Sequence, residues 1–405
     1  MNSFPDDEHV PHLEIPAWDI SLIAFALGLT SMTTQVVLLR ELISVFYGNE
    51  LVIGVMLANW MALTGIGALL GRRLKHIGTP RRFLQIAILL IGLLPALTVS
   101  ALRYLRTIVF PVGTMVDLIS VAWSSFVLLM PYCMLAGFMF TVLASAGSRT
   151  DRSDSIAAVY GAEAAGSFTG GIVFSLLLAL VLNAMQVVVA LFALNILAAL
   201  ALAREQPIAR RLVWGGLILF FIPATLIDLD VRTRQFLFPG QQILSSKDSP
   251  YGNLTVTEQS GQLNVFENNV LLSSTQDVAG SEEPVHYAMA QRPSSKEVLM
   301  VSGAISGAPL EVLKYGIERL EYVDVNPLTI EAARQYTAAL NDRRITVVNE
   351  DVRIFLRSAT TVYDVVLLNL PEPSTVQLNR FYTLEFFGSV KARMSHGAVL
   401  LSTPS

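Results

Sequence analysis

The chain has 405 residues, of which 53% are hydrophobic and only 15% are charged, and its mean hydropathy is +0.55. This composition excludes a soluble protein of ordinary make-up and indicates a membrane protein. The net charge is −4 and no dense Lys/Arg run occurs, so nucleic-acid binding has little support. The single cysteine, Cys133, excludes an intramolecular disulfide, and because no Cys/His cluster has metal-ligand spacing we expect no metal.

Residues 1–19 are acidic and proline-containing, without the basic start or cleavage site of a signal peptide, so we expect a flexible tail. Residues 20–227 are predicted to form a transmembrane domain of about seven helices. The apolar stretches are Ile20–Val45, Leu51–Leu70, Phe83–Leu102, Leu118–Ala146, Ile156–Leu182, Val187–Ala203 and Leu212–Ile227. The last two are short against the ~20 residues of a full span, and the fourth is long enough to tilt or break at Pro131, so the count could change by one.

Small residues recur inside two of these stretches, which predicts close helix packing in lipid. They are Gly65, Gly67 and Gly71 in the second and Gly161, Gly166, Gly170 and Gly171 in the fifth. Arg40, Glu41 and Glu163 would be costly facing lipid, so we expect them to face the bundle interior. A structural ion pair or anchor and a substrate path both remain open for them.

Basic residues in short loops predict which loops are cytoplasmic. The loops after the second, fourth and sixth stretches are basic, whereas the loop after the third holds only Arg103 and Arg106. Seven full spans would then place the C-terminal domain outside, although a nucleoside cofactor is made in the cytosol. We favour a multi-pass protein of the inner cell membrane with a cytoplasmic C-terminal domain. Either one stretch, Leu212–Ile227 first, is then not a full crossing, or the charge rule does not hold for this chain.

The second half has the pattern of a water-soluble fold. Residues 228–242 are expected to be a linker, and residues 243–296 a small β-domain with strands at Leu254–Glu258, Leu263–Glu267 and Val270–Ser273. In residues 297–405 strands and helices alternate, which predicts an α/β domain with a parallel sheet. Its strands are expected at Glu297–Ser302, Arg319–Val323, Ile345–Val348, Tyr363–Leu368 and Ala398–Leu401.

Polar residues and glycines follow successive strands of this second domain. Gly303 and Gly307 follow the first strand, Asp324 comes 21 residues after Gly303, and Asp351 follows the third strand. Glycines allow close backbone approach, and an acidic residue at this distance can bind ribose hydroxyls. We therefore predict a nucleoside site. The alternative is that both aspartates cap helices, and both interpretations can hold together.

These segments resemble the spermidine synthase (polyamine aminopropyltransferase) family, in its bacterial form fused to a multi-spanning membrane region, over most of the chain. VSGAISGAP stands where that family has GGGDGG, and EYVDVNP carries its acidic residue. VVNEDVRIFL carries its aspartate near the adenine, and LLNLPEPSTVQLNRFYT stands at its D-x-x-D-P. The resemblance implies a Rossmann-like domain of the class I methyltransferase type.

By this resemblance Asp324 would bind the ribose hydroxyls, and Asp351 the adenine amino group, of decarboxylated S-adenosylmethionine or a related nucleoside. Gly303 and Gly307 would shape the pocket floor. The acceptor would be a polyamine such as putrescine, and no metal is implied.

The catalytic positions depart from the family. Ile305 stands at the acid of GGGDGG, Asn369 at the first Asp of D-x-x-D-P and Glu372 at the second. An amide cannot accept a proton, and losing a positioned base costs about 10²–10⁴-fold. The family's upstream acid falls on one of three residues, Asp277, Glu282 or Glu283.

The chain stops soon after its fifth predicted strand, where the family continues, so we expect a truncated chain with an unpaired sheet edge. The expected function is that of a membrane-bound spermidine synthase-like transferase whose activity is weak or lost. A non-catalytic nucleoside sensor or a transport-associated protein, with Glu163 as its hint, is the alternative. The expected partners are the lipid bilayer and a polyamine or nucleoside, and a homo-oligomer is left open.

Overall fold

A computed structural model describes residues 16–46, 50–73, 81–111, 116–147, 154–175, 182–203, 211, 214–215, 228–249, 251–275, 277–370, 373 and 375–402. The chain divides into two compact units. The first takes Met1–Glu41, Val55–Leu102 and Ala122–Arg232, and the second takes Leu42–Gly54, Arg103–Val121 and Thr233–Ser405.

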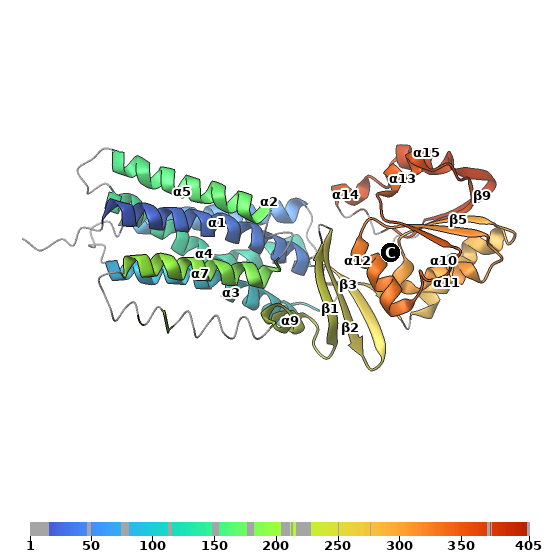
Figure 1. The fold of residues 1–405 in the computed structure, drawn as a ribbon, viewed down its shortest axis with the longest axis horizontal. Helices are drawn as coiled ribbons and strands as arrows, with labels where there is room; N and C mark the ends of the chain where they lie inside the picture. The colour runs from blue at the N-terminus through green and yellow to red at the C-terminus, as the bar shows by residue number, and fades with distance from the viewer. Residues whose placement is uncertain are drawn as a thin grey trace, which may run out of the picture. The chain divides into compact units, whose positions relative to one another are not determined.

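Long apolar helices make up the described part of the N-terminal half (Figure 1). They are α1 (Ala17–Phe46), α2 (Glu50–Arg73), α3 (Arg81–Val109), α4 (Leu118–Gly147), α5 (Asp154–Val173) and α7 (Ala184–Leu202). Within the described residues, five of them are long and apolar enough to cross a membrane: α1, α2, α3, α4 and α7. Helix α4 runs through Pro131 without a break. The seventh predicted stretch, Leu212–Ile227, lies outside the described residues except for residues 214–215.

Helix backbones approach closely at several of the predicted glycines. A Cβ atom on Gly67 or on Gly166 would lie 2.1 Å from a carbonyl oxygen of the neighbouring helix, α4 or α1 respectively. Contacts of under 3.0 Å would also arise one turn along, at Gly71 and Gly170. The packing role is therefore confirmed at these positions. No such contact is present at Gly65 and Gly161, where a Cβ would meet no atom of the described residues within 4 Å.

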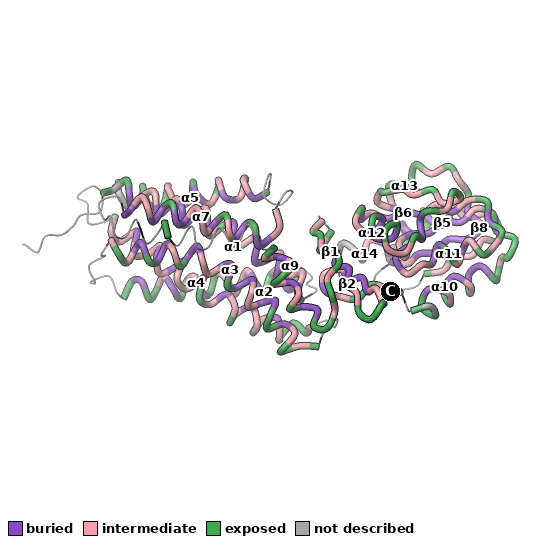
Figure 2. Tube along the Cα trace, turned by 60° about the horizontal axis from the view of Figure 1, so that its bottom comes forward, coloured by how far each residue is buried: buried purple, intermediate pink, exposed green. Residues whose placement is uncertain are grey.

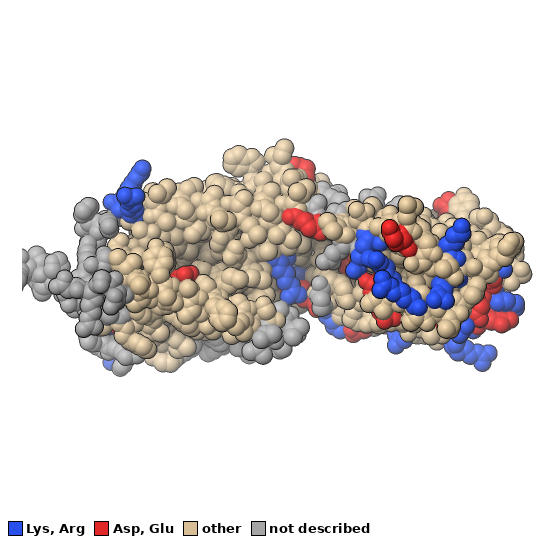
Figure 3. All heavy atoms as spheres, turned by 90° about the horizontal axis from the view of Figure 1, so that it is seen from above, with Lys and Arg blue, Asp and Glu red and all other residues tan. Residues whose placement is uncertain are grey.

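The bundle carries few charged side chains on the face that Figure 3 shows, whereas Lys, Arg, Asp and Glu are frequent over the C-terminal unit. Glu41 is 2% exposed, as its predicted inward orientation requires. Glu163 is half-buried, and its Oε1 lies 3.0 Å from the Ser167 hydroxyl. That hydroxyl also lies 3.2 Å from the Gly28 carbonyl oxygen of α1, so this part of α5 faces α1.

A four-stranded antiparallel sheet in the order β1-β2-β3-β4 precedes the parallel sheet in the second unit. Its strands are β1 (Gln242–Ser249), β2 (Gly252–Gln259), β3 (Gln262–Glu267) and β4 (Val270–Ser274). Helix α9 (Leu229–Arg234) and the turn η2 (Gln235–Leu237) precede it, and α10 (Val278–Gln291) follows it. Residues 242–249 are mostly polar, and their strand is not among those predicted from the sequence.

The second sheet is parallel throughout, in the order β7-β6-β5-β8-β9, which confirms the predicted Rossmann-like arrangement. Its strands are β5 (Glu297–Val301), β6 (Arg319–Val323), β7 (Ile345–Val348), β8 (Tyr363–Leu368) and β9 (Met394–Ser402). Between them lie η3 (Ala304–Ser306), α11 (Ala308–Leu313), α12 (Pro327–Ala332), η4 (Ala333–Thr337), α13 (Val352–Ser358), α14 (Val376–Asn379) and α15 (Leu384–Lys391).

Helices cover both faces of this sheet, with α10, α11 and α12 on one side and α13 and α15 on the other (Figure 1). Two apolar clusters result, one including Met300 and Val312 and the other Leu299 and Phe386. Since successive residues of a strand face opposite sides, neighbours such as Leu299 and Met300 enter different clusters. The central strands are accordingly buried along their length (Figure 2).

The helix after β6 is short. Helix α12 ends at Ala332, and the chain continues only as the π-helical turn η4. Ala338 then takes a left-handed conformation at φ 53°, which an α-helix cannot contain. The amide of Ala339 bonds to the Ala333 carbonyl, and this wider turn ends the helix.

Candidate functional site

The loop after β5 lies at the point where the strand order reverses, since β5 pairs with both β6 and β8. Ligands of open α/β sheets bind at such a point. Ser302, Gly303 and Gly307 have φ values of 57°, 87° and 90°, so the loop turns through left-handed conformations. A Cβ on Gly303 would lie 2.7 Å from Nδ2 of Asn369, which follows β8. The Asn369 amide in turn donates to the Ser302 carbonyl at 3.2 Å.

Asp324 follows β6 and lies beside this loop. It is the residue that we predict from the sequence to bind the ribose hydroxyls. Its Oδ2 accepts a hydrogen bond from the Tyr322 hydroxyl at 2.7 Å, and its Oδ1 accepts one from the Asn326 backbone amide at 2.9 Å. Asp324 is 5% exposed. Burial raises the pKa of the Asp324 carboxyl, and the hydrogen bonds from Tyr322 and Asn326 oppose that rise. The carboxylate is thus held rigidly in place at some electrostatic cost.

Glu267 is a second carboxylate at this place, and sequence reasoning missed it. The Asn326 side-chain amide donates to Glu267 Oε1 at 3.2 Å, so the end of β3 meets the end of β6. Burial raises the pKa of Glu267, and the charge of Asp324 adds to the effect. The only signal in the sequence is an acidic residue at the end of a predicted strand, just before a turn.

Asn269 lies in the same turn, between β3 and β4, and β4 packs beside η3. It is 7% exposed, and neither atom of its side-chain amide has a hydrogen-bond partner among the described residues. A buried polar group without a partner costs free energy, so it needs an explanation such as a water or a ligand. This turn and the carboxylates of Glu267 and Asp324 together form a polar corner next to the loop after β5.

Asp351 follows β7 and caps helix α13, which is the alternative role that the sequence left open for it. Its Oδ1 accepts from the Arg353 amide at 2.8 Å as the N-cap of α13, and its Oδ2 pairs with Arg380 at 2.7 Å. Asn349 donates to the Asp324 backbone carbonyl at 2.8 Å, which joins the ends of β6 and β7. Capping does not exclude a ligand, because a carboxylate oxygen can accept more than one hydrogen bond.

The positions where the resembling family has catalytic acids have different chemistry here. Ile305 is 8% exposed and belongs to the apolar cluster that also holds Met300. Asn369 presents an amide whose nitrogen is occupied by the Ser302 carbonyl. Glu372 lies outside the described residues. Of these positions, the two that the structure describes therefore have an apolar side chain and an amide, neither of which can act as a base.

The three residues considered for the upstream acid lie at or on α10. Asp277 caps this helix by accepting from the Gly280 amide at 3.0 Å, and Glu283 is exposed. Glu282 is half-buried and pairs with Lys314 of the segment after α11 at 3.3 Å. Of the three, Glu282 alone joins a cluster of side chains between two helices.

Comparison with known proteins finds similar sequences for the C-terminal part of the chain. Residues 279–403 match the model of the spermine/spermidine synthase domain. A polyamine aminopropyltransferase of Leptospira interrogans is 30% identical over 168 residues, which is 39% of this chain and 34% of that protein. The polyamine aminopropyltransferase 1 of Streptomyces coelicolor is 26% identical over 283 residues, which is 63% of this chain and 52% of that protein.

Among solved structures, a spermidine synthase in complex with the transition state analogue AdoDATO is 23% identical, with a TM-score of 0.37 over 39% of this chain and 57% of that one. Spermidine synthase from Thermotoga maritima is 22% identical, with a TM-score of 0.36 over 39% of this chain and 56% of that one. The matched region spans about a third of the Leptospira relative's length.

Proposed function

We propose that this chain, whose residues 279–403 are a spermine/spermidine synthase domain, binds decarboxylated S-adenosylmethionine or a related purine nucleoside at the ends of β5, β6 and β7. The observation that carries the proposal is the placement of Asp324 beside the glycine loop at the strand-order reversal. Its carboxylate is buried and held by Tyr322 and Asn326, so it is oriented before any ligand arrives. Such preorganisation lowers the entropic cost of binding a ribose.

The chemistry that follows binding is expected to be weak aminopropyl transfer or none. Transfer to a polyamine needs a neutral amine nucleophile, so a base must take its proton. Asn369 cannot serve, because an amide nitrogen is a donor and its carbonyl oxygen is not basic. Ile305 offers no charge for a cationic substrate. Glu372 is the remaining carboxylate of the family motif, and this proposal gives it the role of residual base.

A nucleoside sensor without chemistry is the second candidate, and the same two residues favour it. Ile305 packs in the core, and the Asn369 amide donates to Ser302, so both are built into the fold. A domain without acids at positions 305 and 369 but with Asp324 and Asp351 would bind the nucleoside and report its presence. Turnover distinguishes the two candidates.

We further propose that the N-terminal helices anchor the chain in the inner membrane and that the C-terminal domain lies in the cytoplasm. Five described helices have the length and composition for crossing a membrane. Their glycine contacts, such as that at Gly166, suit packing in lipid, where close backbone approach replaces the hydrophobic effect.

Thermal stability of the purified full chain tests the binding proposal. We expect decarboxylated S-adenosylmethionine, S-adenosylmethionine or methylthioadenosine to raise the melting temperature, because a ligand of the folded state stabilises it. The Asp324→Asn variant should lose that shift. Asp342→Asn is the matched control, because Asp342 is an aspartate of the same domain that pairs with Arg344 instead. Shifts of equal size in both variants, or none in the unmodified chain, would defeat the proposal.

A further inference from the structure

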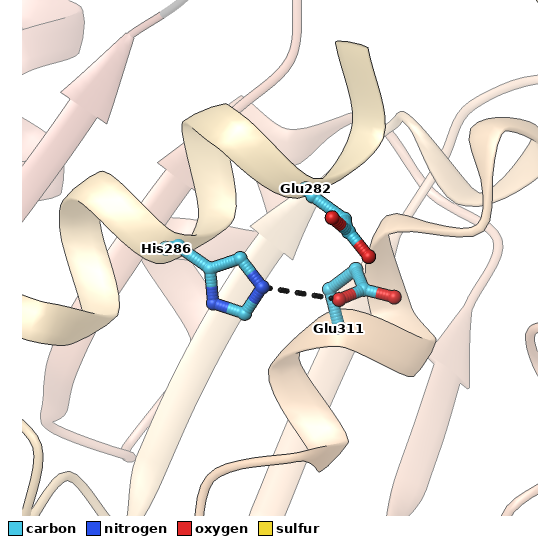
Figure 4. A group of neighbouring side chains, drawn as sticks. All are labelled: Glu282, His286 and Glu311. Carbon is cyan, nitrogen blue, oxygen red and sulfur yellow. Dashed lines mark hydrogen bonds and ion pairs between the residues drawn. The ribbon is translucent and has the colours of Figure 1, made fainter. Parts of the chain in front are cut away.

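Three side chains from two helices converge beside α10 and α11. Glu282 and His286 are one turn apart on α10 and therefore share a face. Glu311 comes from α11, and one ligand atom from each of the three residues lies within 4.8 Å of the others. Figure 4 shows the three side chains pointing toward one another, with His286 Nε2 at 3.2 Å from Glu311 Oε2.

The positive charge in this cluster comes from a lysine. Lys314 Nζ lies 2.5 Å from Glu311 Oε2 and 3.3 Å from Glu282 Oε1, so one ammonium serves two carboxylates. The Lys314 side chain is 54% exposed. A long, exposed lysine can turn into solvent at little cost, because exposed ion pairs contribute little to stability. A cation that binds the carboxylates more firmly would therefore displace it.

His286 is held in a suitable orientation by a neighbouring hydroxyl. Its Nδ1 lies 2.8 Å from the Tyr315 hydroxyl. When Nδ1 carries the proton and donates to Tyr315, the lone pair of Nε2 points toward the two glutamates. Metal-binding histidines are oriented in this way, by a hydrogen bond from the ring nitrogen that does not bind the metal.

We propose that Glu282, His286 and Glu311 bind a divalent transition-metal ion of the Zn²⁺ type, with Lys314 as a built-in competitor. An imidazole together with carboxylates suits zinc and its neighbours, whereas Mg²⁺ and Ca²⁺ prefer oxygen ligands alone. Three protein ligands leave a coordination position open for water or a small ligand. The proposal differs from the expectation of no metal, which considered only Cys/His spacing and not Glu-x-x-x-His on a helix.

Metal binding at this place would join α10 to α11. Helix α11 begins directly after the Gly303–Gly307 loop, and both helices contact η3 within that loop. A bound ion would therefore stiffen one wall of the candidate nucleoside site. The metal proposal does not depend on the nucleoside proposal, because its ligands and its test involve no nucleoside.

Direct metal titration of the full chain tests the proposal. The chain is purified in detergent, freed of its tag and of metal by a chelator, and titrated with Zn²⁺ against a chromophoric chelator; Co²⁺ serves as a spectroscopic probe. The tail histidines His9 and His12 are replaced by alanine throughout, so that they add no binding. We expect one Zn²⁺ per chain, and its loss in His286→Ala. The control His396→Ala, an exposed histidine of β9, should bind as the parent chain does.

Two further variants separate metal ligation from a merely structural cluster. Tyr315→Phe should weaken Zn²⁺ binding about 10–100-fold, the usual effect of removing the group that orients a ligand. Lys314→Met should tighten it about two- to fivefold, the scale of the exposed ion pairs that the metal no longer has to break. Misfolding cannot produce tighter binding. Retained binding in His286→Ala, or unchanged or weaker binding in Lys314→Met, would overturn the proposal.

Discussion

Replacing Gly303 by alanine tests whether the loop after β5 and the Asn369 side chain form one packed unit. Gly303 has a φ of 87°, and an added Cβ would lie 2.7 Å from Asn369 Nδ2 and 3.0 Å from Asn369 Cβ. Because the Asn369 Cβ is fixed to the backbone, the side chain cannot simply rotate away. The substitution therefore meets both an unfavourable backbone conformation and a steric clash.

The two costs can be separated with Gly307. A left-handed conformation costs an alanine about 1–2 kcal/mol. Overpacking at a tight contact adds about 1–3 kcal/mol. Gly307 has a φ of 90°, but a Cβ there would meet no atom of the described residues within 4 Å, so we expect Gly307→Ala to carry the backbone cost alone. We expect Gly303→Ala to be the more destabilising variant by the packing cost, about 1–3 kcal/mol.

Hydrogen exchange read by mass spectrometry measures this difference in the full chain. All four tryptophans precede residue 215, so tryptophan fluorescence does not report on the C-terminal unit. The opening free energy of the β5 amides, Glu297–Val301, does report on it. Equal destabilisation by Gly303→Ala and Gly307→Ala would refute the contact between this loop and Asn369.

Three other expectations follow from the site and the composition. Burial raises the pKa of Asp324 above the unfolded value of about 3.9, so its contribution to stability falls as pH rises through the folded pKa. Over that pH range the melting temperature of the Asp324→Asn variant should change less with pH than that of the unmodified chain. The unmodified chain should release little methylthioadenosine from decarboxylated S-adenosylmethionine and putrescine. Asn369→Asp should raise this rate by up to about 10²–10⁴-fold. Robust turnover by the unmodified chain would contradict this and make Glu372 the working base. The chain should stay in the membrane pellet after carbonate extraction, and its recovery in the soluble fraction would contradict the membrane proposal.

The parallel sheet could be predicted because its signals are local. Short apolar runs such as Val298–Val301 alternate with helical segments, and each strand ends at a polar residue or a glycine. Asp324 and Asp351 could be placed at strand ends for the same reason. Whether each acts as a cap or as a ligand depends on neighbours in space, so the sequence left both interpretations open.

Contacts between segments that are far apart in the chain could not be predicted from the sequence. Glu267 meets Asn326 across 59 residues, and Glu311 meets His286 across 25, and no local period links either pair. The bundle shows the same limit, because a glycine pattern does not reveal which face of a helix meets a neighbour. Gly166 lies against α1 and Gly161 does not, although both belong to one small-residue pattern.

Calorimetric titration of the full chain with decarboxylated S-adenosylmethionine, before and after Asp324→Ala, tests the nucleoside site most directly. We predict binding of one ligand per chain, weakened by about 1–3 kcal/mol in the variant, the scale of hydrogen bonds to a charged group. Asp342→Ala, whose carboxylate pairs with Arg344, should bind as the unmodified chain does. Equal affinity of the Asp324→Ala variant and the unmodified chain, with both shown to be folded, would contradict the account and leave Asp324 as a structural residue alone.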